Sequence, residues 1–418
     1  MEQKTSYKLP IAIMFALFFM IAFVTGLPSP MGVIVAKQFG ASAFESQLGF
    51  FANFIAYAFM GIPAGLMLKR IGYKKTAMTA VTVGFVGVGV QFLSGVAGSF
   101  AVYLAGAFIC GFSVCMLNTV VNPMLNTLGG GGNKGNQLLL FGGASNSIGA
   151  TIVPFLVGYL MGAEAGRTIE KANPALFIAM AIFAVAFAVL AFSKIPEPHM
   201  EKRVDKAATP DKYGPMSFRH FILGTIAIFI YVGVEIGLPS TANLYMTQQL
   251  GIDAAVAGSI VGLYWLLMLC GRLVGGSIGA KVSSRTMMIF VSTAGLAMLA
   301  AAILLPASTA VTLPASLGGV KVPVSIVLIV LCGLCTSVMW GGIFNLAVEG
   351  LGKYTAAASG IFMVMVCGGG IIPALQGWVA DMTDYVASYW VIFACLAYLL
   401  YYATLGCKNV NKDIPVEE

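Results

Sequence analysis

Three asparagines, Asn118, Asn122 and Asn126, stand four residues apart in the otherwise apolar stretch CMLNTVVNPMLNTL. A spacing of four keeps side chains on one stripe of a helix. Amides donate and accept hydrogen bonds, which suits solutes that carry hydroxyl or amide groups. An amide among lipid tails would have no partner, so the stripe must face protein or water. We predict that Asn118 and Asn122 line a polar passage; the alternative is that they link helices.

Two charged residues lie deep inside apolar stretches. Of the 16 acidic residues only Glu235 does so, and Arg272 is the one basic residue well inside such a stretch. A charge at the centre of a bilayer costs about 3 kcal/mol on insertion scales and marks a functional site by default. We predict that Glu235 binds a proton, a sodium ion or a substrate hydroxyl; the alternative is a structural glutamate. Arg272 could pair with Glu235, bind a substrate carboxylate or extend to the membrane surface.

Further amides and aromatic side chains occur at intervals in the apolar stretches. Aromatic faces beside amides commonly hold sugars, because the ring stacks on C–H groups while the amides bind hydroxyls. Each aromatic taken alone is equally compatible with core packing or with anchoring at the membrane interface. The remaining predicted substrate-binding residues are Asn146, Asn243, Tyr264, Trp265, Trp340, Asn345 and Gln376.

The elements that must position these residues are membrane helices. Only 9% of the 418 residues are charged, against roughly 25% in soluble domains. Apolar runs of about 20 residues cross a bilayer as helices, whereas barrel strands are about half as long and alternate in polarity. We therefore expect an all-α membrane protein of twelve transmembrane helices in two six-helix bundles, its first helix retained and not a cleaved signal peptide. The spans are placed near 9–36, 46–68, 76–97, 100–127, 137–162, 174–194, 219–247, 254–280, 286–306, 323–348, 355–380 and 385–406.

The distribution of basic residues predicts the orientation. Of the 23 Lys and Arg residues, 18 fall on one side of the membrane in this arrangement, 4 on the other, and Arg272 within a span. Basic residues favour the cytoplasmic side. We expect both termini to be cytoplasmic, in a cytoplasmic (inner) membrane. The net charge of +7 then reflects topology and attraction to anionic lipid headgroups, and not binding of nucleic acid.

A polar stretch, Lys194 to His220, divides the chain in two. We expect an N-terminal bundle over 1–196, a cytoplasmic linker over 197–217 and a C-terminal bundle over 218–418. Glycines followed by basic residues recur at Gly65–Lys75 and Gly275–Arg285, at the same place in each half. This recurrence indicates an internal duplication, and such repeats place the binding site between the halves near the middle of the membrane.

Motifs of other function classes do not fit. The run Gly129–Gly132 lacks the order of a phosphate-binding loop, and Cys332-Gly-Leu-Cys335 has neither a second pair nor a histidine beside it. The sequence holds no metal-ligand cluster, nucleophile elbow or paired carboxylates. We expect neither an enzyme nor a bound cofactor or metal.

Several ordered motifs carry a family resemblance. They are Gly61-Ile-Pro-Ala-Gly65 with Gly72-Tyr-Lys74, Asn122-Pro123, Asn146-Ser-Ile-Gly149, Tyr264-Trp265 with Gly271-Arg272, Phe344-Asn345 and Gly368–Gly377. Over nearly its whole length the chain resembles the major facilitator superfamily, and within it the fucose and glucose/galactose sugar:cation symporters. The resemblance implies import of a monosaccharide by alternating access, driven by protons or sodium ions.

The resemblance also implies roles for particular residues. The fucose transporters carry protons on an Asp of the first helix and a Glu of the fourth, where this chain has Ser29 and Asn118. Neither side chain titrates in a useful range, and Gly143 stands where the family has an amide. Asn146 matches a substrate-contacting Asn, and Glu235 matches a Glu of the glucose/galactose branch. Glu235 therefore remains as the coupling residue.

Together these features predict a monomeric secondary active transporter. We expect it to import a small polar solute, a monosaccharide, with H⁺ or Na⁺, through a cavity lined by helices 1, 4, 7 and 10. One alternative is an uncoupled facilitator or an exporter of another small polar metabolite. A membrane sensor is a second, but a sensor needs a cytoplasmic domain larger than the linker or the tail after Gly406.

Overall fold

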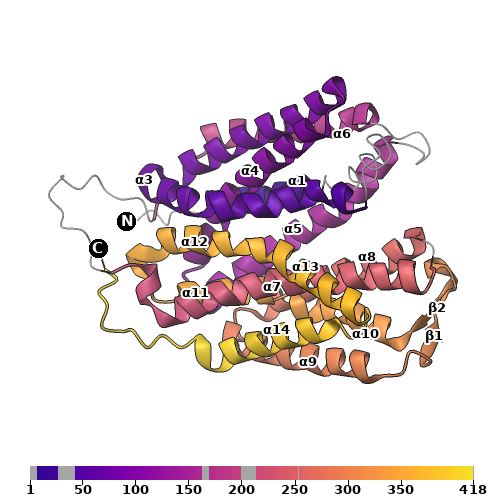
Figure 1. Ribbon diagram of the computed structural model, residues 1–418. Helices are drawn as coiled ribbons and strands as arrows, with labels where there is room; N and C mark the ends of the chain where they lie inside the picture. The colour runs from indigo at the N-terminus through magenta and orange to yellow at the C-terminus, as the bar shows by residue number, and fades with distance from the viewer. Residues whose placement is uncertain (1–6, 27–42, 162–168, 199–212, 253, 418) are drawn as a thin grey trace.

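The computed structural model describes residues 7–26, 43–161, 169–198, 213–252 and 254–417, and its described part is mostly helical (Figure 1). The helices are α1 (Lys8–Gly26), α3 (Ala43–Ala97), α4 (Phe100–Leu128), α5 (Gly132–Met161), α6 (Ile169–Phe192), α7 (Arg219–Leu244), α8 (Ala254–Ile278), α9 (Ser284–Leu304), α10 (Val324–Thr336), α11 (Met339–Val348), α12 (Thr355–Val364), α13 (Gly368–Met382) and α14 (Tyr389–Tyr401). Two short antiparallel strands, β1 (Ala310–Thr312) and β2 (Lys321–Pro323), join α9 to α10.

Ten helical segments in these described ranges are long and apolar enough to cross a membrane. One of them belongs to α3, whose 55 residues would extend about 80 Å as a straight helix, far beyond the ~30 Å hydrocarbon core. The backbone leaves the helical conformation at Gly72, so α3 is two helices joined at a kink. The expected all-α, multi-pass membrane fold is confirmed, whereas the number of twelve spans stays a prediction. Positions 27–36 of the first expected span lie outside the described residues.

The kink in α3 is held by the end of α6 and by the segment that follows it. Gly72 has a φ of 83°, which glycine adopts readily and other residues do not. The Glu197 carboxylate accepts hydrogen bonds from the backbone amides of Tyr73 and Lys74. In return, Lys74 Nζ donates to the carbonyl oxygens of Ala191 and Ser193, at 2.7 and 2.9 Å. Each helix end thus supplies the partners that the other lacks.

Two of the expected spans are interrupted. The span predicted over 323–348 breaks between α10 and α11 at Ser337 and Val338, and the span over 355–380 breaks between α12 and α13 at residues Met365–Cys367. Irregular backbone at membrane depth is tolerated where it is buried in protein or lines a cavity. These breaks therefore point to the interior of the molecule.

Figure 1 shows α1, α3, α4 and α6 together on one side of the molecule, with α7, α9, α10 and α14 on the other. The two groups meet along a seam where α5 packs against α8 and α3 against α12. A Cβ added to Gly360 of α12 would lie 2.6 Å from the carbonyl oxygen of Gly61 in α3. Glycine is therefore required at this approach, because any side chain would push the helices apart.

Candidate functional site

A cavity of about 130 Å³ lies at the seam. Both groups of helices contribute to its wall, as the expected site between two halves requires. Its lining residues are Phe18, Ile21 and Thr25 of α1, Phe54 and Tyr57 of α3, Asn118 of α4, Gly143 and Asn146 of α5, Val232 and Glu235 of α7, Arg272 of α8, Trp340 of α11, and Val366.

The charged pair at this cavity joins the two groups of helices. Arg272 Nη2 lies 3.2 Å from Glu235 Oε1, and the side chains are 9% and 14% exposed. Arg272 Nη1 donates to the carbonyl oxygen of Gly143 at 2.9 Å and to Ser147 Oγ at 2.6 Å, both in α5. Arg272 Nε donates at 3.4 Å to the carbonyl oxygen of Ser337, at the break between α10 and α11. The guanidinium is thereby fixed on several sides, and its charge is balanced by Glu235 alone among these partners.

The asparagine stripe of α4 faces protein and the cavity, as predicted, and its three members do different things. Asn118 lines the cavity and donates from Nδ2 to the Tyr57 hydroxyl at 2.8 Å. Asn122 Oδ1 accepts from Trp340 Nε1 at 2.9 Å, and Asn126 Nδ2 donates to Asn345 Oδ1 at 2.7 Å. The latter two bonds cross the seam, so these positions link the groups of helices.

Two other predicted residues lie at the cavity. Asn146 Nδ2 donates to the carbonyl oxygen of Phe18 at 3.0 Å, which leaves its Oδ1 without a partner among the bonds described. Trp340 lines the cavity with its indole, which also packs edge-to-face against Tyr231 at 6.3 Å between ring centroids. Amide and aromatic groups thus stand beside the charged pair.

The remaining predicted residues are not in this cavity. Tyr264 is buried with its hydroxyl 2.9 Å from Thr336 Oγ1, and Trp265 packs edge-to-face against it. Asn345 donates to Ser284 Oγ at 2.9 Å and borders a separate pocket near the tail. Gln376 is fully buried without a hydrogen-bond partner. Asn243 lies near the far end of α7, and Ser29 lies outside the described residues. The substrate-binding role of these residues stays a prediction.

Sequence reasoning missed Tyr57 and Ser147. Ser147 follows Asn146 directly, and two adjacent polar residues inside an apolar span are a signal that was available. Tyr57 sits in the run Phe54-Ile-Ala-Tyr57, where nothing in the sequence separates it from an ordinary core tyrosine. Its role depends on the neighbour that the fold gives it.

The seam is closed at one end of the molecule, which we term the basic end because it carries Lys69–Lys75, Lys134 and Lys281. There the Asn126–Asn345 bond is joined by Gln137 Nε2, which donates to the Gly276 carbonyl oxygen at 2.9 Å. Ser359 Oγ donates to the Thr119 carbonyl oxygen at 3.2 Å. These bonds separate the cavity from the basic end.

Curated relatives align with nearly the whole length of the chain. The glucose/galactose transporter of Brucella abortus (strain 9-941) is 28% identical to it over 98% of this chain and 96% of its own. The L-fucose-proton symporter of Escherichia coli (strain K12) is 23% identical over the same shares, 98% and 96%. Each relative thus aligns over nearly its full length.

Solved structures show the same fold. The fucose:proton symporter FucP in the outward conformation superposes with a TM-score of 0.80 at 20% identity, covering 95% of this chain and 98% of that one. The proton:xylose symporter XylE gives 0.71 at 12% identity, with 97% and 96% covered. The sequence model of the Major Facilitator Superfamily matches residues 13–374. The chain therefore belongs to the Major Facilitator Superfamily.

Proposed function

We propose that this protein imports a monosaccharide by alternating access, coupled to a proton or a sodium ion. One observation carries the proposal: a cavity at the seam holds a buried ion pair that both groups of helices contact, beside amides and an indole. The named functions of the relatives, sugar transport and proton symport, support it. A site at the seam can be exposed to either side in turn when the two groups rock.

The chemistry of the wall suits a neutral polyol. Asn118 and Asn146 offer amide groups, and Trp340 offers an aromatic face on which the C–H side of a sugar ring stacks. Arg272 is already neutralised by Glu235, so the cavity carries no surplus positive charge for a substrate carboxylate. A hydroxylated, uncharged solute therefore fits better than a sugar acid.

Coupling follows from the ion pair. While Glu235 is ionised it attracts Arg272, which also binds Gly143 and Ser147 of the opposite group. A proton or a sodium ion on Glu235 removes that attraction and changes how firmly the two groups are joined. Cation binding and the movement of the groups are thereby linked in one site.

We further propose that the basic end faces the cytoplasm, with both termini there, in the inner membrane. The rocking bodies are residues 1–196 and 218–418, joined by the linker 197–217, in a monomer surrounded by lipid. The bonds across the seam at the basic end then form the cytoplasmic gate, closed in this conformation.

Thermal stabilisation by ligands tests the substrate class. The purified protein is heated in detergent with glucose, galactose, fucose, xylose, gluconate, glucuronate or an amino acid. A ligand that binds only the folded state at 100 times its Kd stabilises by about 2.7 kcal/mol. We expect a neutral monosaccharide to raise the melting temperature and the acids to have no effect. Stabilisation by acids or amino acids alone would contradict the proposal.

The cytoplasmic gate gives a steric prediction. We expect Gly360→Leu to hold the gate open, since its side chain would meet the backbone of Gly61 and Gly65. Overpacking costs about 1–3 kcal/mol, a shift of roughly fivefold to 140-fold toward the open gate. Uptake and counterflow should both fall by about that factor. Gly377→Leu is the control, because an added Cβ there meets no atom within 4 Å.

Opening of the gate is measured with a reporter cysteine at Asn136, which is fully buried and lies against Gly341 across the seam. In an Asn136→Cys background, maleimide should label the Gly360→Leu protein faster than the Gly377→Leu protein. If the Gly360→Leu and Gly377→Leu proteins are labelled at the same rate and uptake is unchanged, the added side chain at position 360 does not open the gate, and the prediction is wrong.

A further inference from the structure

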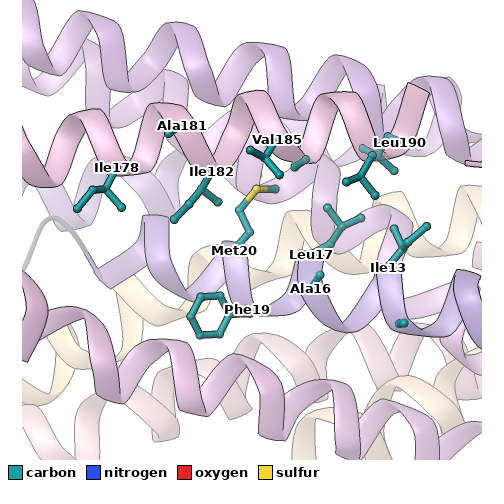
Figure 2. A pocket seen from close by; sticks show the side chains of 13 residues that line it. Ile13, Ala16, Leu17, Phe19, Met20, Ile178, Ala181, Ile182, Val185 and Leu190 are labelled. Carbon is teal, nitrogen blue, oxygen red and sulfur yellow. The ribbon is translucent and has the colours of Figure 1, made fainter. Parts of the chain in front are cut away.

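A second cavity, of about 680 Å³, opens between α1 and α6 (Figure 2). In Figure 2 Ile13, Leu17 and Met20 of α1 point toward Ile182, Val185 and Leu190 of α6 across an open groove. All its lining residues are apolar. We call this feature the α1–α6 groove.

Water is not a stable occupant of the α1–α6 groove, because water needs two to four polar partners and these side chains offer none. The α6 wall of the groove is open to the outside, because its lining residues Val185 and Val189 are 63% and 44% exposed. In a multi-pass membrane protein such a surface meets the hydrocarbon of the bilayer. An acyl chain is therefore the occupant whose chemistry suits this space.

The groove reaches the basic end of the molecule. Its last lining residues there are Ala12 of α1 and Leu190 of α6. Lys8 lies one helical turn before Ala12, Lys194 is the second residue after α6, and both are exposed. Lys74 lies at the same end of α6, where its Nζ donates to the Ala191 carbonyl oxygen. An apolar groove with ammonium groups at its mouth matches a lipid with an acyl chain and an anionic headgroup.

We propose that the α1–α6 groove binds an acyl chain of an anionic phospholipid from the cytoplasmic leaflet, with its phosphate between Lys8 and Lys194. The inference rests on the proposed orientation of the basic end. At this end Glu197 accepts hydrogen bonds from the Tyr73 and Lys74 amides. The positive charges that act on its carboxylate are those of Lys75 and Lys74, and not those of Lys8 and Lys194.

The bound chain would act on transport through α1. Ala16, Leu17 and Met20 face the groove, while Phe18, Ile21 and Thr25 of the same helix line the central cavity. One helix therefore carries lipid on one face and the substrate site on the other. An acyl chain between α1 and α6 would hold the two helices apart and so fix where α1 stands in the wall of the central cavity.

Native mass spectrometry of the detergent-solubilised protein tests the proposal. Palmitoyl-oleoyl phosphatidylglycerol is titrated against phosphatidylcholine with the same chains, and glycerol 3-phosphate serves as the headgroup without chains. Each surface lysine adds about 1 kcal/mol toward anionic lipid, so two give a preference of about 30-fold for phosphatidylglycerol. We expect Lys8→Gln with Lys194→Gln to abolish that preference and the control Lys281→Gln to keep it. Binding of glycerol 3-phosphate as tight as that of the lipid would overturn the role of the groove.

Filling the groove is the second arm. Ala16→Phe with Ala181→Trp occupies the space between the helices, and we expect the tightly bound lipid to be lost. Ala188→Trp is the matched control, because Ala188 is exposed on the same helix but does not line the groove. Retention of lipid by the filled variant would overturn the proposal. So would a wild-type protein that is detected as a dimer and a filled variant that is not, because the groove would then bind a second copy of the chain. This readout does not involve sugar, so its failure is distinct from failure of the proposed transport function.

Discussion

Replacing Glu235 by Gln is expected to abolish concentrative uptake in proteoliposomes while counterflow exchange of the sugar continues. The amide keeps the shape of the side chain but cannot bind a proton or neutralise Arg272. With one proton per sugar, an imposed gradient of two pH units supports accumulation of about 100-fold, at tenfold per unit. In the variant the accumulation ratio should fall to one. Exchange should persist because Asn118, Asn146 and Trp340 remain in the cavity wall.

The control is Asp381→Asn, which neutralises an exposed acid at the end of α13 and should leave accumulation unchanged. Replacing sodium by choline then separates the two cations: uptake that survives is driven by protons, and uptake that is lost is driven by sodium. Accumulation by the Glu235→Gln protein against a gradient would rule out this residue as the coupling group. Wild-type uptake that depends on neither cation would instead identify a facilitator.

The secondary structure was predictable where composition decides it. The span expected over 100–127 is α4, Phe100–Leu128, and the span expected over 286–306 is α9, Ser284–Leu304. The breaks at Ser337 and at Met365–Cys367 were not predicted, because Ser337 is a single small residue in an apolar run and Met365–Cys367 is as apolar as its neighbours. Their backbone is shaped by contacts across the molecule, among them the bond from Arg272 to the Ser337 carbonyl oxygen. A local pattern carries no information about such partners.

The candidate site was predictable only in part, because the sequence shows which residues are unusual but not which neighbours they meet. A lone acid and a lone base inside apolar spans are expensive, and their pairing, which was one of three alternatives for Arg272, is what the structure has. The four-residue spacing of the asparagines fixed a common face of α4 but not the neighbour that each meets. Asn118 reaches Tyr57 on its own side of the seam, whereas Asn126 reaches Asn345 across it.

Replacing Arg272 by Met is expected to destabilise the protein by about 3–5 kcal/mol, because it leaves the Glu235 carboxylate buried without its partner. Ser147 Oγ and the Gly143 carbonyl oxygen also lose their donor. The free energy of unfolding is measured by titration with SDS in mixed micelles. Arg219→Met is the control, since Arg219 is exposed at the start of α7, and its effect should stay within about 0.5 kcal/mol.

The double variant Glu235→Gln with Arg272→Met separates stability from coupling. Removing both charges at once leaves no unpaired ion, so most of the lost stability should return. Transport coupled to a cation should stay absent, because no carboxylate remains among the residues that line the cavity. A double variant that is stable but uncoupled would show that the Glu235–Arg272 pair serves the response to a cation. It would also show that the pair adds no stability beyond that of uncharged side chains at the same positions. If the double variant is as unstable as Arg272→Met alone, the pair is structural, and the bonds from Arg272 to α5 and Ser337 carry its contribution.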